Sequence, residues 1–564
     1  MKKNYRWIII SVIVLLSLFI GTMAWRWKSL PWSPGYITST PFIPPVEEIP
    51  PTATIIIPSA STPTFFIPST STPTVEPDRV WLDPALPLDL QEELRGRGDL
   101  LITDDLENTG TSLTYSEENP LAYWVLVAAV PFPTVQDGLT LVCLQCAWQG
   151  CSNPLASTQP LLMSGETRDI LAAIWGEPAP GAVEIIDKEE LSSQAWSRRP
   201  SLAILPFEDL EPSWKVLRVD GISPLQGDFN PMEYGLALPI SALGTTPELL
   251  QGVEGNWDRE KMTTVVLTGV TALVRATAWT MEIKGINYPA VDILDYLVEA
   301  DILHISNEVP FAQDCPYPDP DQKDLRFCSD SRYIELMETI GTDVVELTGD
   351  HFSDYGTDAL FYTLELYNER GWPYYGGGSS RQDAQEPVLL EHNGNKIAFL
   401  GCNAKGGGYA RASDGYPGAV ACDFPKMVSQ IQELVEEGYN PIATFQHYEY
   451  YAYEAQYDQI RDARILSNAG AVIVSGSQAH QPQGLEIRDG SFIHHGLGNL
   501  FFDQNTWFPP NTASAFIDRH IFYNGKHIST ELLTIWFIDS ARARPMTQIE
   551  REELLQIVFD ASGW

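Results

Sequence analysis

Short apolar runs in the C-terminal half of the chain each end in polar residues. Brief β-branched runs that alternate with helical stretches indicate buried parallel strands. Because open α/β sheets bind ligands beyond the carboxyl ends of their strands, we expect the polar residues after these runs to converge on one site. The runs occupy residues 265–267, 302–305, 344–347, 442–445, 471–474 and 492–493.

The histidines support a site in this half of the chain. All nine lie beyond residue 303 of the 564 residues, whereas a solvated surface would scatter them more evenly. Three isolated histidines are expected at surface or loop positions: His392, His520 and His527.

Residues 1–29 predict a membrane anchor. Lys2, Lys3 and Arg6 precede an apolar run from residue 7 to 25, long enough to cross a hydrocarbon core of about 30 Å as a helix. No small-x-small cleavage site follows cleanly, which favours an uncleaved signal anchor over a cleaved signal peptide. The preceding basic residues place the N-terminus in the cytoplasm. We therefore expect a single-pass protein of the cell membrane with an extracytoplasmic body.

The next segment, residues 30–78, is rich in proline, serine and threonine. It contains a tandem decapeptide at residues 55–64 and 65–74. Proline at this density excludes helices and central strands, so the segment predicts a disordered, extended spacer.

The charge balance restricts the partners. The chain has 35 basic and 74 acidic residues, a formal net charge of -39. Its long-range field would repel nucleic acid, so we expect no nucleic-acid partner. An anionic substrate would need a local positive centre, such as a bound metal or an arginine.

The seven cysteines suit an oxidising exterior. Cys315 and Cys328 flank a proline-rich loop, and we predict a disulfide between them. Cys402 and Cys422 bracket a glycine-rich loop, where a second disulfide and two buried thiols are equal alternatives. The others lack the second pair and the nearby histidine of a zinc site. They are Cys143, Cys146 and Cys151.

A middle segment, residues 79–255, has no histidine and many strand-like runs, among them residues 122–130, 202–207 and 214–221. It resembles an extracytoplasmic solute-binding protein, which implies an α/β domain. A ligand-binding lobe and an inert spacer remain equal alternatives.

The C-terminal segment, residues 260–564, resembles the CapA family of capsule and poly-γ-glutamate synthesis proteins. This resemblance implies a layered α/β fold like that of calcineurin-type metallophosphatases. The motifs that carry it, in the family's order, are residues 300–302 with 307–310, 341–345 with 350–351 and 354–356, 396–401, 447–450, 476–480 and 496–503.

The chain departs from the family's metal motifs at several positions. Gly269-Val270 stands where the family has Gly-Asp, which removes a carboxylate expected to bridge two metals, and Gln478 replaces a histidine. Gly349-Asp350-His351 replaces Asn-Asn-His, and Glu449 does not occupy the family's glutamate position. These departures favour one divalent ion over a dinuclear site.

The remaining candidates supply oxygen and imidazole ligands suited to zinc, manganese or iron. The expected metal ligands are Glu308, Asp350, His351, His447 and His480. A metal lowers the pKa of bound water while a nearby side chain moves the proton, and His351 and Glu449 are the catalytic candidates. Candidate polar contacts for an anionic ligand are Arg275, Asn307 and Asn499.

Two functions from different classes stay open. The first is a membrane-anchored, metal-dependent hydrolase or transferase of capsule or cell-envelope polymer metabolism. The second is a non-catalytic extracellular scaffold that binds the polymer or a solute in a metal-free cleft. In both, the expected partners are an anionic envelope polymer or its precursor, the membrane and other capsule-synthesis proteins.

Overall fold

The computed structural model describes residues 79–107, 109–155, 159–504 and 510–564. The predicted membrane anchor and the proline-rich spacer lie outside these residues. None of the described helices has the length and hydropathy needed to cross a bilayer.

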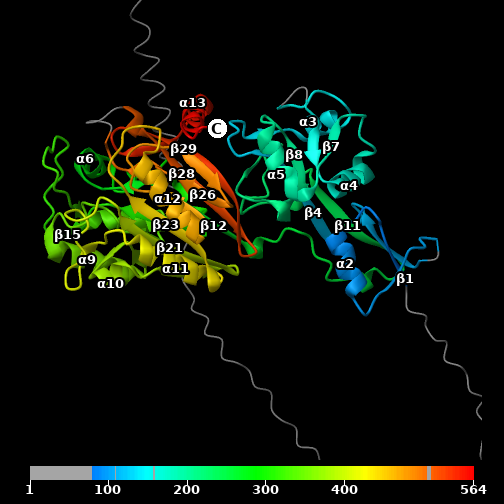
Figure 1. Ribbon diagram of the computed structural model, residues 1–564, viewed down its shortest axis with the longest axis horizontal. Helices are drawn as coiled ribbons and strands as arrows, with labels where there is room; N and C mark the ends of the chain where they lie inside the picture. Colours follow the sequence, from blue (N-terminus) through cyan, green and yellow to red (C-terminus); the bar gives the residue numbers. More distant parts are fainter. Residues whose placement is uncertain (1–78, 108, 156–158, 505–509) are drawn as a thin grey trace, which may run out of the picture. The chain divides into compact units, whose positions relative to one another are not determined.

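The middle domain is a mixed sheet with helices packed against it (Figure 1). The α/β class predicted for it is confirmed, and its solute-binding role stays a prediction. The strand order is β2 (Leu101–Thr103), β1 (Arg79–Leu82), β3 (Thr111–Tyr115), β11 (Ala237–Gly244), β4 (Ala122–Pro131), β8 (Ala203–Pro206), β6 (Leu161–Met163) and β7 (Val183–Ile185), with β9 (Trp214–Val216) paired to β4. The helices are α2 (Leu88–Gly96), α3 (Leu141–Trp148), α4 (Gly165–Trp175) and α5 (Lys188–Ser197).

The C-terminal domain contains two larger sheets. The first has the order β18 (Tyr374–Tyr375), β17 (Val344–Glu346), β14 (Ile302–Asn307), β12 (Met262–Thr268), β28 (Ser514–Tyr523), β29 (Lys526–Ile538) and β30 (Arg542–Pro545). The short strand β13 (Val270–Thr271) pairs with β14 and β27 (Asn499–Phe501). The second sheet has the order β20 (Val388–His392), β21 (Asn395–Asn403), β23 (Asn440–Gln446), β24 (Ile473–Ser475), β26 (Ser491–His494) and β25 (Leu485–Arg488).

The two sheets pack against each other, and helices cover their outer faces. This layering is possible because the side chains of each strand alternate between its two faces. Ile302 of β14 packs in a layer with Phe399 of β21 and Ile442 of β23. The next residue, Leu303, points to the opposite face and joins the core formed with the helices of the first sheet, as the twofold period of a strand requires. Those helices are α6 (Arg275–Lys284), α7 (Leu294–Val298), α8 (Ile334–Thr339) and α9 (Gly356–Arg370).

Two helices cover the outer face of the second sheet, α11 (Phe424–Glu436) and α12 (Tyr457–Ala469). Each predicted apolar run overlaps a strand, and the predicted layered α/β architecture of the domain is confirmed. The runs divide equally between the two sheets: β12, β14 and β17 lie in the first, and β23, β24 and β26 in the second. A helix at the end of the chain, α13 (Gln548–Ala561), completes the domain.

Two isolated histidines are not at the surface. His520 on β28 is fully buried and His527 on β29 is 7% exposed, so the prediction of surface or loop positions is wrong for both. The long hairpin of β28 and β29 places them in the core, where His520 Nδ1 lies 2.8 Å from the hydroxyl of Thr530.

Three disulfides link cysteines of the described residues. The predicted bond between Cys315 and Cys328 is confirmed, and Cys402 and Cys422 are also bonded. Cys146 pairs with Cys151, which uses two of the three cysteines of the middle domain in a short loop.

Candidate metal centre

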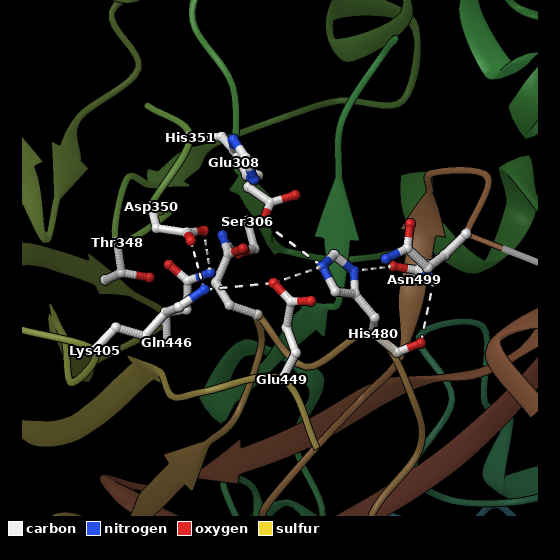
Figure 2. Close-up of polar contacts among 12 residues, drawn as sticks. Ser306, Glu308, Thr348, Asp350, His351, Lys405, Gln446, Glu449, His480 and Asn499 are labelled. Atoms are coloured by element: carbon white, nitrogen blue, oxygen red, sulfur yellow. Dashed lines mark hydrogen bonds and ion pairs between the residues drawn. The ribbon is translucent and has the colours of Figure 1, made fainter. Parts of the chain in front are cut away.

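Three side chains that could ligate a metal ion meet where two neighbouring strands end (Figure 2). Strands β14 and β17 are parallel partners, with Ser306 opposite Glu346. Glu308 directly follows β14, and Asp350 and His351 follow β17. One ligand atom from each of these three residues lies within 4.8 Å of the others, so together they can contact one ion.

Gly349 allows the two strand ends to approach each other. A Cβ atom at this position would lie 2.8 Å from the Cα atom and from the carbonyl oxygen of Glu308. Real Cβ atoms essentially never come so close to backbone. The absence of a side chain at Gly349 therefore helps to bring Asp350 and Glu308 together.

The carboxyl group of Glu308 is buried and incompletely partnered. The residue is 1% exposed, and its Oε1 atom has no hydrogen-bond partner among the described residues. Burial raises the pKa of Glu308. Because an unpartnered charge in a buried site is costly, a cation bound at Oε1 would stabilise the ionised form. The donor set therefore fits a divalent ion.

The ring of His351 is oriented by a carboxylate. Its Nδ1 atom lies 2.7 Å from Oδ2 of Asp354, so Nδ1 carries the proton and Nε2 is left for a metal, an arrangement common for metal-bound histidines. Burial opposes protonation of the ring, but Asp354, Glu308 and Asp350 outweigh it and raise the pKa of His351 to about 9. An ion must therefore displace a proton from this ring near neutral pH.

Loops of the second sheet contact the same cluster. Nζ of Lys405, beyond β21, lies 2.5 Å from Oδ2 of Asp350 and 3.4 Å from Oε1 of Glu449. Gln446, the last residue of β23, donates to Oδ1 of Asp350 at 2.7 Å. Burial would raise the pKa of Asp350, but the charges of His351 and Lys405 hold it below its usual value. Asp350 is therefore an ionised ligand candidate.

His480 faces the cluster from the loop after β24 (Figure 2). Nδ2 of Asn499 donates to the backbone carbonyls of His480 and Thr512, so its Oδ1 accepts a hydrogen bond from Nδ1 of His480 at 2.9 Å. Nε2 of His480 lies 3.7 Å from Oε1 of Glu308 and 3.9 Å from Oε1 of Glu449. This nitrogen is the one available to a metal or to a transferred proton.

Glu449 is held in its ionised form. Burial would raise the pKa of Glu449, but His480 and Lys405 hold it below its usual value. The hydroxyl of Tyr451 donates to its Oε2 at 3.0 Å. The carboxylate therefore presents one oxygen to the cluster while the other is fixed.

A buried polar layer connects the two sheets next to the cluster. Ser477, after β24, donates to the carboxylate of Glu346 on β17, and Gln478 donates to the hydroxyl of Ser306 on β14 at 2.6 Å. Nε2 of His304 lies 3.2 Å from Oε2 of Glu346. Gln478, which stands where a ligand histidine was expected, thus links the sheets instead.

Residues 264–504 match the family model described as "Bacterial capsule synthesis protein PGA_cap". The C-terminal domain belongs to the CapA family. The match begins in β12 and includes each residue of the cluster described above.

Two curated relatives also match this CapA-family domain. The chain is 26% identical over 205 residues to the PGA biosynthesis protein CapA of Bacillus subtilis (strain 168), which covers 36% of this chain and 53% of that protein. It is 23% identical over 309 residues to the capsule biosynthesis protein CapA of Bacillus anthracis, covering 53% and 75% of the two chains. The match thus spans about half the length of the first relative.

The chain is also similar to solved structures. A 5'-nucleotidase precursor from Thermus thermophilus matches with a TM-score of 0.31 and 13% identity, covering 53% of this chain and 57% of that one. An ABC-type phosphate transport receptor from Vibrio cholerae matches with a TM-score of 0.24 and 13% identity, covering 29% and 84%.

The CapA-family domain does not bring His447 to the cluster. The two ring nitrogens of His447 lie 3.6 Å from Oδ2 of Asp462 and 3.9 Å from Oδ2 of Asp458, both on α12. The expectation that His447 shares the site is therefore wrong. Successive residues of a strand point to opposite faces, and Gln446 takes the inward position.

Two predicted ligand contacts are engaged within the protein. The guanidinium of Arg275 lies over the rings of Phe327 and Phe502, at 5.2 and 4.7 Å from their centroids. The amide of Asn307 is buried and donates to the hydroxyl of Tyr367 at 2.8 Å. Contact of Arg275 or Asn307 with a ligand stays a prediction.

Sequence reasoning missed Lys405 and Gln446 as members of the site. Like the other candidates, both lie at or just beyond the end of a buried strand. Gln446 ends β23, and Lys405 follows β21 by two residues. The glycines at 406–408 predicted a glycine-rich loop between Cys402 and Cys422, and no chemical role was predicted for the lysine before them.

Proposed function

We propose that this protein is a membrane-anchored, extracytoplasmic enzyme of capsule or cell-envelope polymer metabolism. Its CapA-family domain would bind one divalent ion and hydrolyse or transfer an ester or amide bond of an anionic polymer. The observation that carries this proposal is the convergence of Glu308, Asp350 and His351 within 4.8 Å, with a buried oxygen of Glu308 that accepts no hydrogen bond from the described residues.

The side chains around the ion have distinct roles in this proposal. A bound divalent ion supplies a Lewis acid and lowers the pKa of coordinated water. Nε2 of His480 accepts or donates a proton, because Asn499 fixes the proton on Nδ1. Glu449 is a second proton acceptor. Lys405 neutralises carboxylate charge at the site, which lessens the repulsion between an anionic polymer and a chain with a net charge of -39.

Metal content of the full chain tests the site. Purified protein should bind one Zn²⁺ or Mn²⁺ per chain, measured by plasma mass spectrometry after dialysis and by calorimetry. Glu308→Gln should weaken binding by at least about a hundredfold, since the loss of an outer partner alone costs up to about that factor. Glu365→Gln on the exposed side of α9 is the matched control. Wild-type protein that binds no ion would refute the proposal.

Turnover distinguishes the bond that is attacked. We would assay bis(p-nitrophenyl) phosphate for ester cleavage and γ-glutamyl-p-nitroanilide for amide cleavage, with and without chelator. If release of nitrophenol or nitroaniline requires the ion, the result supports the proposal that the protein is an enzyme.

A second candidate is a non-catalytic scaffold that binds the polymer. The ion pair between Lys405 and Asp350 favours it, because the protein supplies part of the neutralising charge itself. Stoichiometric binding of poly-γ-glutamate, with unchanged polymer length in size-exclusion chromatography and no turnover of either probe, would support this candidate.

A further inference from the structure

The ammonium group of Lys405 occupies the position of a bridging cation. It lies 2.5 Å from an oxygen of Asp350, from the first sheet, and 3.4 Å from an oxygen of Glu449, from the second. The Lys405 side chain is only 7% exposed. A buried lysine between two carboxylates makes the contacts that a metal shared by them would make (Figure 2).

The backbone around Lys405 holds it there. Its amide donates to Oδ1 of Asn403 at 3.0 Å, and the side-chain nitrogen of Asn403 donates to the backbone carbonyl of Thr348 at 2.8 Å and to Oε1 of Gln446 at 2.7 Å. The ammonium also lies 4.7 Å from the ring centroid of Tyr409. These contacts make the lysine a fixed part of the site rather than a surface side chain that folds in by chance.

The charges support one ion rather than two. Three carboxylates face the cluster, from Glu308, Asp350 and Glu449. One divalent ion together with the ammonium of Lys405 balances these three negative charges. A second divalent ion beside the lysine would add positive charge without a counter-charge at short range.

We infer that the ammonium of Lys405 takes the place of a second divalent ion and restricts this CapA-family site to one. The inference rests on the metal site of the proposed function and goes further, because it assigns the metal stoichiometry to one residue. Removing the ammonium frees oxygens of Asp350 and Glu449, and Nε2 of His480 lies 3.9 Å from Glu449. These three donors are enough for a second ion with water in its remaining positions.

The test compares Mn²⁺ binding to wild-type, Lys405→Met and Lys405→Arg full chains. Calorimetry and plasma mass spectrometry should give one ion per chain for the wild type and for Lys405→Arg, and two for Lys405→Met. Electron paramagnetic resonance of Lys405→Met should then show the multiline spectrum of two coupled Mn²⁺ ions. Lys396→Met, on β21 and outside the site, is the control for loss of a positive charge.

Each outcome separates the inference from the proposed function. One ion in both the wild type and a folded Lys405→Met would overturn the inference and leave the metal dependence of the proposed function intact. Two ions in the wild type would have the same meaning. No ion in the wild type refutes the function and the inference with it. If Lys405→Met is unfolded by circular dichroism, Lys405→Ala supplies the same comparison.

Discussion

At the residue scale, the site depends on a position with no side chain. Gly349 faces the backbone of Glu308, and a methyl group there would require the loop after β14 to move. Metal sites tolerate displacements of only about 0.5 Å before their function suffers.

We expect Gly349→Ala to weaken Zn²⁺ or Mn²⁺ binding by about tenfold to a hundredfold, the range found for residues that position metal ligands. Calorimetry measures the change. Gly407→Ala is the matched control, because a Cβ at Gly407 would meet no atom within 4 Å. Equal affinities for the two variants would contradict this account of Gly349.

The sequence indicated which residues could take part but not which way each side chain points. Glu308, Asp350, His351 and His480 were found because each follows a buried strand. Gln446 and His447 are adjacent at the end of one such strand. If the alternation of inward and outward side chains is assigned one residue out of step, the two residues exchange faces of the sheet. Only the packing of β23 against its neighbours decides that Gln446 faces the cluster.

At the scale of elements, the sequence predicted the six strands but not their division into two sheets. An apolar run carries no information on which strand it will pair with. The hairpin of β28 and β29 also lay outside these predictions, so its histidines were assigned to the surface. Both are buried, and burial lowers the pKa of His520 well below its usual value and that of His527 to about 3.

The hairpin should make the domain sensitive to acid. His527 titrates near 6.5 when unfolded and near 3 when folded, so the unfolded chain binds the additional proton between these values. The free energy of unfolding therefore falls as the pH decreases below about 6.5, by about 1.4 kcal/mol per pH unit for this residue.

His527→Gln should lower that pH dependence by about the same amount. Urea unfolding between pH 4.5 and 7.5 measures it, and the difference at pH 7.5 isolates the packing cost of the substitution. Parallel pH profiles for the variant and the wild type would show that His527 does not titrate as described.

At the scale of the whole molecule, two disulfides close loops of the CapA-family domain. The bond between Cys402 and Cys422 spans 20 positions and encloses Lys405, and the bond between Cys315 and Cys328 spans 13. Loops of about this length contribute about 3 kcal/mol when closed, by constraining the unfolded chain.

We expect the Cys402→Ser/Cys422→Ser double variant to lose about 3 kcal/mol of stability in urea unfolding. Its affinity for Mn²⁺ should also differ from that of the wild type, because the loop that contains Lys405 is no longer closed by the disulfide. Cys146→Ser/Cys151→Ser is the comparison, since that bond spans 5 positions and lies outside the CapA-family domain. An unchanged unfolding free energy in the first double variant would exclude this role of the bond.

The two sheets contribute different halves of the site, Glu308, Asp350 and His351 from one and Lys405, Glu449 and His480 from the other. Any fluctuation that separates the sheets must break the pair between Lys405 and Asp350. Binding of an ion or ligand at the loops would therefore oppose fluctuations that separate the two sheets. An occupied site would slow amide hydrogen exchange in strands such as β12 and β24, which contain none of these six residues.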